Sequence, residues 1–231
     1  PTIADLFNRG FEGYLIPITL QGGVIHTLLR REALDLVASR VALHEGEPVA
    51  VSFINGRGRV YRLGSFGVFK DWRGKGVGKW LMEQLIEEAK GRGATSMRLE
   101  VIQQNTPAVN LYRSLGFQTV QSLVGFRAEN PAGTASPYTE IDPLIAARLL
   151  IQHSPNLPWQ ICGETLLASN PNLRTFQLGQ TVLFIEFLGT ESVLVRGMLR
   201  GTAEEVQTLF RALFSDFPGR NWRLVAVFPE R

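Results

Sequence analysis

The sequence has little of what metal sites and disulfides require. Its 231 residues include a single cysteine, Cys162, and three histidines, His26, His44 and His153. One cysteine excludes a disulfide within the chain, and the scattered histidines do not have the spacing of a zinc site. We therefore expect no bound metal.

Long hydrophobic runs are also absent. No uninterrupted apolar stretch approaches the roughly 20 residues needed to span a bilayer. The first residues, Pro1 to Asp5, lack the charged and then apolar order of a secretion signal. Since 45% of the residues are hydrophobic, the chain has enough apolar material for a buried core. We expect a globular, cytoplasmic protein that does not contact a membrane.

Charge of one sign is not concentrated anywhere. The formal net charge is +3, and the basic residues form no run of the kind that marks a nucleic-acid-binding surface. A solvated surface, or a basic loop facing a phosphorylated ligand, explains this small excess. We expect no nucleic-acid partner. A nucleotide- or nucleic-acid-binding protein is kept as the weakest of three interpretations of this sequence; the other two are given below.

What the sequence does contain is a glycine-studded turn, Arg73-Gly74-Lys75-Gly76-Val77-Gly78-Lys79, between a predicted strand ending at Val68 and a predicted helix beginning near Gly76. Glycine permits positive φ and lets an anion approach the main chain closely. The first amides of a helix lack partners within the helix and carry its positive dipole. This turn therefore predicts a site for a diphosphate.

The pattern around this turn predicts alternating strands and helices. Two helices are expected at residues 3–11 and about 30–37. A third is expected to begin near Gly76 and to end at 91–93, with Trp80 in the core. A fourth is expected to have Thr106 as its N-cap and to continue to Leu115. Strands are expected at 41–43, 49–54, 60–68, 97–101 and 117–126, with a hairpin turn at Asn55-Gly56. Residues 60–102 then form a right-handed βαβ unit with the turn at its carboxyl edge.

A linker composition over Asn130–Pro137 separates this part from a second one. After a helix at about 143–152, strands at 182–188 and 192–198, a helix at 203–214 and a strand at 223–228 repeat the order of the first part. Here Thr202 and Glu205 form a capping box in place of the glycine turn. We predict a mixed α/β fold with domain 1–127, linker 128–158, and a half-domain 159–231 without a cofactor site, although two unrelated α/β units remain an alternative.

Three motifs together resemble the GNAT family of N-acetyltransferases. They are Arg73-x-x-Gly76-x-Gly78 after a strand, Leu99-Glu100-Val101 followed by Asn105 and Ala108, and Leu111-Tyr112-x-x-x-Gly116-Phe117. The resemblance covers about residues 3–127. Lys70 departs from it, since many members have proline there. The second part resembles the degenerate GNAT-like half that some members carry.

The resemblance implies an acetyl-CoA site between diverging strands that end near Val68 and Ile102. Cofactor-binding residues would be Phe66 and Val68 on the strand, Arg73, Gly74, Lys75, Gly76, Val77, Gly78 and Lys79 in the turn, and Asn105 and Tyr112 beyond it. Tyr112 matches the tyrosine near the sulfur and would act as the acid, and Glu100 is a candidate base. The main-chain amide of Val68 could stabilise the oxyanion.

Each of these residues also has an ordinary structural interpretation. Arg73, Lys75 and Lys79 could be solvated, Tyr112 could serve core packing, Glu100 could be ion-paired, and Asn105 could cap a turn.

The sequence predicts an enzyme that transfers an acetyl group from acetyl-CoA to the primary amine of a small molecule or peptide, by direct attack in a ternary complex. The alternative is a non-catalytic acyl-CoA-binding regulatory or scaffold module. Acceptor walls are expected from Leu6 to Tyr14 and near Gly22 to Arg31. The second part could cover the acceptor side or mediate a homodimer.

Overall fold

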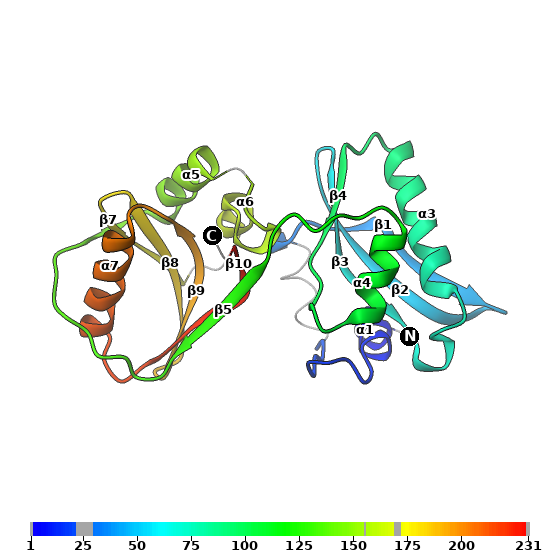
Figure 1. The fold of residues 1–231 in the computed structure, drawn as a ribbon, viewed down its shortest axis with the longest axis horizontal. Coiled ribbons are helices and arrows are strands. Elements are labelled where there is room, and N and C mark those ends of the chain that lie inside the picture. Colours follow the sequence, from blue (N-terminus) through cyan, green and yellow to red (C-terminus); the bar gives the residue numbers. More distant parts are fainter. Residues whose placement is uncertain (1, 22–29, 155, 169–171, 230–231) are drawn as a thin grey trace. The chain divides into compact units, whose positions relative to one another are not determined.

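The computed structural model describes residues 2–21, 30–154, 156–168 and 172–229, except for the side chains of 225–227. Within it the chain divides into two compact units, Pro1–Thr119 and Val120–Arg231 (Figure 1). Both are built from helices packed on a mixed sheet, which confirms the predicted α/β class.

The N-terminal unit contains a four-stranded sheet in the order β1-β2-β3-β4. Its elements are α1 (Ile3–Gly10), β1 (Leu34–His44), β2 (Glu47–Arg57), β3 (Val60–Val68), α3 (Val77–Gly91), β4 (Ser96–Leu99) and α4 (Thr106–Ser114), with a short 3-10 helix at Lys70–Trp72. The first three strands are antiparallel, and β3 and β4 are parallel. The predicted βαβ unit is thus present.

Helices cover both faces of this sheet. Helices α3 and α4 lie on one face (Figure 1). Leu81, Met82 and Leu85 of α3 and Tyr112 of α4 belong to one core cluster with buried residues of β1, β2 and β3. On the other face, Leu6 and Phe7 of α1 pack against Val51 and Phe53 of β2. The three- and four-residue spacing of the α3 core residues explains why this helix forms and which side it buries.

The C-terminal unit contains a six-stranded sheet in the order β5-β10-β9-β8-β7-β6. The strands are β5 (Leu123–Ala128), β6 (Thr139–Ile141), β7 (Leu173–Leu178), β8 (Thr181–Leu188), β9 (Ser192–Leu199) and β10 (Asn221–Pro229). The helices are α5 (Pro143–His153), α6 (Gly163–Leu167) and α7 (Ala203–Asp216), with a 3-10 turn at Trp159–Ile161. Only the β9–β10 pair is parallel among these ladders.

Alternation along β8 divides the core of this unit into two layers. Leu183 and Ile185 face α7, whereas Val182 and Phe184 face α5 and α6. All four side chains are fully buried, and a strand covered on both faces is expected to be apolar throughout. The predicted strands and helix of the second part are confirmed, and so is the Thr202–Glu205 capping box.

Several predicted boundaries differ from the structure. The segment expected to be a helix at 30–37 contributes Leu34 onward to strand β1. Asn55 and Gly56 lie inside β2 rather than in the hairpin turn, because β2 continues to Arg57 and the chain reverses at Gly58, where φ is +57°. The side chain of Asn55 is instead used to accept a hydrogen bond from Arg62.

Two further expectations in the region after the glycine turn are corrected. Trp80 is 52% exposed, since it lies on the side of α3 away from Leu81 and Leu85. The cap of α4 is Asn105 rather than Thr106, because Asn105 Oδ1 accepts from the amide of Ala108. Thr106 is the first residue of the helix.

The division between units falls between Thr119 and Val120, whereas we expected 127. The reason is β5, which follows α4 in sequence and pairs with β10 of the C-terminal sheet. The segment expected to be a linker likewise supplies β6, which pairs with β7. The helix predicted within it at about 143–152 is confirmed as α5.

A close approach between α1 and β3 yields a stability prediction. A Cβ added to Gly67 would lie 2.6 Å from the Cα of Gly10. Gly67→Ala should therefore destabilise the protein by about 2 kcal/mol, as overpacking does. Gly91→Ala is the control, because a Cβ at Gly91 meets no atom of the described residues within 4 Å and alanine favours a helix. Urea unfolding measures both variants; equal stability would contradict the proposed contact.

Candidate functional site

Strands β3 and β4 diverge at their carboxyl ends. Their parallel ladder runs from Val60 paired with Ser96 to Leu63 paired with Leu99. Strand β4 then ends, whereas β3 continues to Val68 along β2. The carboxyl end of β3 therefore has no β4 neighbour, as expected of a strand that could pair with an extended ligand.

A β-bulge accompanies this divergence. In the β2–β3 ladder Ile54 is paired with Leu63 and Phe53 with Ser65, so that Gly64 is an extra residue. A Cβ on Gly64 would lie 2.1 Å from Oδ1 of Asn55, which explains why glycine occupies this position. Bulges increase the local twist of a strand, and this one follows directly on the last β3 residue that pairs with β4.

The glycine turn supplies hydrogen-bond donors next to the diverging strands. Gly74 and Gly76 have φ of +73° and +83°, and Gly76 is the N-cap of α3 without a side-chain cap. Within the described part of the chain, the amides from Gly74 to Lys79 donate no hydrogen bond. These amides and the positive end of the α3 dipole can together bind an anion.

Three elements meet at Gly78. A Cβ built on this residue would lie 3.4 Å from Cγ2 of Val68, 3.6 Å from Cδ2 of Leu111 and 3.7 Å from the Phe66 ring. The structure thus brings together the predicted residues of β3, the glycine turn and the middle of α4.

Tyr112 occupies the α4 position next to Leu111. Its side chain is 9% exposed and packs edge to face on Phe117 at 5.9 Å between ring centroids. Burial, with a smaller contribution from Tyr14, raises the pKa of Tyr112 to about 12. The phenol therefore keeps its proton at neutral pH, and no side chain or backbone group among the described residues is hydrogen-bonded to its hydroxyl.

The basic residues of the turn have different surroundings. The Arg73 guanidinium donates from Nε to the carbonyl of Val68 (2.9 Å) and from Nη2 to those of Gly10 (3.3 Å) and Glu12 (2.7 Å). It therefore joins the end of β3 to the segment after α1. The amino group of Lys75 lies over the ring of Trp72. Nζ of Lys79 is 3.9 Å from Oε1 of Glu83.

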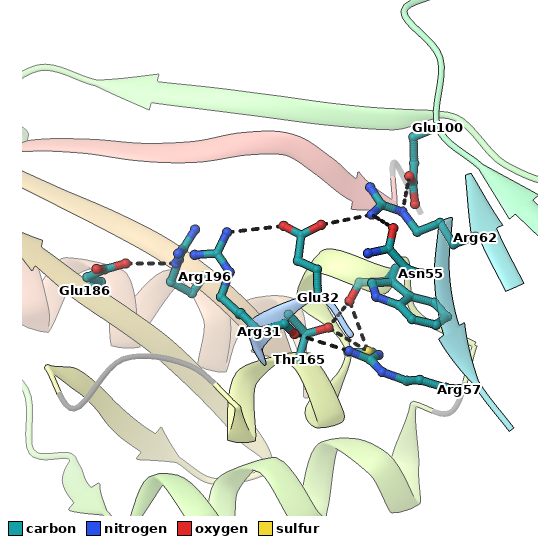
Figure 2. A network of polar contacts seen from close by, with 11 residues as sticks. Arg31, Glu32, Asn55, Arg57, Arg62, Glu100, Thr165, Glu186 and Arg196 are labelled. Atoms are coloured by element: carbon teal, nitrogen blue, oxygen red, sulfur yellow. Dashed lines mark hydrogen bonds and ion pairs between the residues drawn. The ribbon is translucent and has the colours of Figure 1, made fainter. Parts of the chain in front are cut away.

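Glu100 follows β4 and belongs to a network that sequence reasoning missed (Figure 2). Arg62, with only 5% of its side chain exposed, donates to Glu100 at 2.8 Å, to Glu32 at 2.9 Å and to Asn55 at 3.2 Å. Two carboxylates compensate the positive charge of the buried guanidinium, because a buried charge without a partner would destabilise the fold. This arrangement favours a structural role for Glu100. The one hint in the sequence is an arginine between Tyr61 and Leu63 in an apolar strand.

The described residues contain no group of three or more His, Cys, Asp or Glu side chains that could hold a metal ion. No helix in that part of the chain is both long and apolar enough to cross a membrane. The predicted acceptor wall near Gly22 to Arg31 lies largely outside the described residues, whereas Leu6 to Tyr14 lie within them.

The N-terminal unit is similar in sequence to known proteins. Residues 7–117 match the family model of the Acetyltransferase (GNAT) family. The chain is 40% identical over 80 residues to a mycothiol acetyltransferase of Thermobifida fusca, covering 35% of this chain and 21% of that enzyme. It is 32% identical over 134 residues to that of Propionibacterium freudenreichii, covering 57% of this chain and 38% of the relative. The chain thus spans less than half the length of these two relatives.

A solved structure shares the fold along nearly the whole chain. The crystal structure of a GCN5-related N-acetyltransferase from Sphaerobacter thermophilus superposes with a TM-score of 0.66 at 16% identity, covering 96% of this chain and 81% of that one. At this identity the likeness concerns the fold.

The contacts of Arg73 lead to a second prediction. Arg73→Met removes the donors that hold Gly10 and Glu12 beside the end of β3. Amide hydrogen exchange in residues 11–14 should become faster by about tenfold, the effect of losing a hydrogen bond. Lys75→Met is the control, because Lys75 lies in the same turn and contacts Trp72 instead. Exchange that stays at the wild-type rate in Arg73→Met would show that the guanidinium does not hold this segment.

Proposed function

We propose that residues 7–117, which match the GNAT family model, form a GNAT domain and that the protein is an N-acetyltransferase that uses acetyl-CoA. One observation carries the proposal. The amides of Gly74 to Lys79, which donate no hydrogen bond within the described residues, lie at the start of α3, beside the end of β3 that has no β4 neighbour. The amides fit a diphosphate, and the strand end fits an extended, amide-containing arm.

The residues of the site divide the binding between them. The amides of the turn hold the diphosphate, while the main chain of Phe66 to Val68 pairs with the pantetheine arm. Arg73 uses its side chain to hold the turn in place, and its amide donates to the carbonyl of Lys70. Lys75 and Lys79 are exposed and add positive charge for the phosphates. Asn105 caps the start of α4 with its side-chain oxygen. Its side-chain nitrogen, Nδ2, is then available to donate to the pantetheine arm.

Acetyl-CoA supplies an activated acetyl group as a thioester. The amine that accepts it has an ordinary pKa near 10.4 and must lose a proton before attack. We assign the amide of Val68 to stabilising the oxyanion of the tetrahedral intermediate. Glu100 is the weaker candidate for the base, since Arg62 already engages its carboxylate, and a chain of water molecules can serve instead.

Tyr112 is assigned to the leaving thiolate. A thiol has an ordinary pKa of about 8.5, whereas the pKa of Tyr112 is raised to about 12. The proton is therefore more stable on the phenol than on the sulfur. We conclude that Tyr112 acts mainly by donating a hydrogen bond to the thiolate rather than by complete proton transfer.

The diphosphate site can be tested with Gly76→Asp. The added carboxylate occupies the amides and repels the diphosphate, so the Kd for acetyl-CoA should rise at least about tenfold. Gly93→Asp is a matched control at the other end of α3. Both glycines have positive φ, +83° and +76°, and at neither would an added Cβ lie within 4 Å of an atom in the described part of the chain. Titration calorimetry measures both affinities; similar values for the two variants would show that the site is misplaced.

The role of Tyr112 predicts a separate kinetic effect. Tyr112→Phe should lower kcat about 10- to 100-fold, the loss of a hydrogen bond to a charged group, with little change in acetyl-CoA affinity. The loss should be constant between about pH 7 and 9, because the phenol is protonated throughout. Tyr61→Phe removes a hydroxyl from the same core cluster and should leave kcat unchanged. Release of CoA in the presence of amines provides the assay, and an unaltered kcat would remove Tyr112 from the mechanism.

A further inference from the structure

The C-terminal sheet repeats the strand divergence of the N-terminal one. Strands β9 and β10 are paired in parallel from Ser192 with Asn221 to Val195 with Leu224. In the β8–β9 ladder Ile185 is paired with Val195 and Phe184 with Gly197, so that Arg196 is an extra residue. A bulge thus follows the last parallel pair here, as Gly64 does in β3. Arg196 itself is ion-paired with Glu186 (Figure 2).

A cavity of about 180 Å³ lies where these strands have diverged. It is lined by Ser154, Leu157, Ile161, Met198, Arg200, Phe228 and Pro229. Met198 and Arg200 stand two and four residues after the bulge, as Phe66 and Val68 do in β3. The cavity therefore occupies the position that corresponds to the proposed acetyl-CoA arm in the other unit.

The start of helix α7 excludes a diphosphate beside this cavity. Thr202 Oγ1 accepts from the amide of Glu205 at 3.1 Å, and the Glu205 carboxylate accepts from the amides of Thr202 at 3.1 Å and Gln180 at 3.3 Å. The amide of Gly201 donates to Thr181. Three of the amides at this helix start, those of Gly201, Thr202 and Glu205, are therefore already occupied, and a carboxylate that would repel a phosphate lies among them.

The lining nevertheless fits a different anion. Leu157, Ile161, Met198 and Phe228 give the cavity apolar walls. Arg200 is exposed, and within the described part of the chain it has no ion pair or hydrogen-bond acceptor for its guanidinium. An arginine fork matches a carboxylate in geometry and charge. Cavities of about 150 Å³ hold a benzene ring, so the apolar part of the ligand should be about as large as one benzene ring.

We propose that this cavity binds a small monocarboxylate with a compact apolar body, the carboxylate paired with Arg200 and the body enclosed by Met198 and Phe228. The site is separate from the acetyl-CoA site and needs no nucleotide.

Benzoate is the probe, titrated calorimetrically into the full chain. We expect a Kd of about 1 mM or lower, as a ligand of this size can reach. Neutral benzamide should bind at least about tenfold more weakly. Arg200→Met should weaken benzoate binding to a similar extent. Arg223 is an exposed arginine of β10 outside the cavity, so Arg223→Met should leave benzoate binding unchanged. Met198→Trp fills the cavity and should abolish binding without removing the cation.

Further titrations separate this site from the proposed enzyme activity. Benzoate should bind equally well to Gly76→Asp and in the presence of saturating acetyl-CoA. Displacement of benzoate by acetyl-CoA, or absence of benzoate binding to the wild-type chain, would overturn the proposal. Binding that Arg200→Met and Met198→Trp both leave unchanged would place the ligand elsewhere and overturn it as well. None of these results depends on acetyl transfer.

Discussion

The end of parallel pairing between two neighbouring strands is the constraint on which the candidate site depends. In the N-terminal sheet, Gly64 adds one residue to β3 just after the last pair with β4. Added twist at a bulge turns the strand away from its former partner, and backbone groups that lose a ladder partner require another one. The same arrangement at Arg196 opens the C-terminal sheet. A ligand site thus arises from backbone geometry before any side chain is considered.

What each unit can bind there depends on the amides at the start of the following helix. Glycines before α3 leave these donors without partners in the described structure, whereas Thr202 and Glu205 occupy them before α7. The intervening segments differ accordingly. Eight residues, 69–76, separate β3 from α3, but three, 200–202, separate β9 from α7. The longer segment has room to form an anion-binding turn, and the shorter one supports only a capped helix.

Sequence reasoning succeeded where a local pattern determines the structure. The spacing of Leu81 and Leu85 predicted α3, the positive-φ glycines marked the turn, and Thr202 with Glu205 predicted their own capping box. It failed where distant residues decide. Asn55-Gly56 has the composition of a turn, but the bond from Arg62 to Asn55 and the continuing ladder keep it in a strand. Nor could local pattern show that β5 pairs with β10 or that Glu32 and Glu100 share Arg62.

Arg73 shows how the architecture around the turn constrains what binds there. Its amide donates to the carbonyl of Lys70, and its guanidinium donates to the carbonyls of Val68, Gly10 and Glu12. A side chain reaching toward a phosphate would leave those three carbonyls without this donor. By holding the segment after α1 against the end of β3, Arg73 also positions Tyr14, which is close enough to influence Tyr112. The backbone of the turn is therefore the better binding site for the diphosphate. Arg73 connects this site to the segment proposed to contact the acceptor.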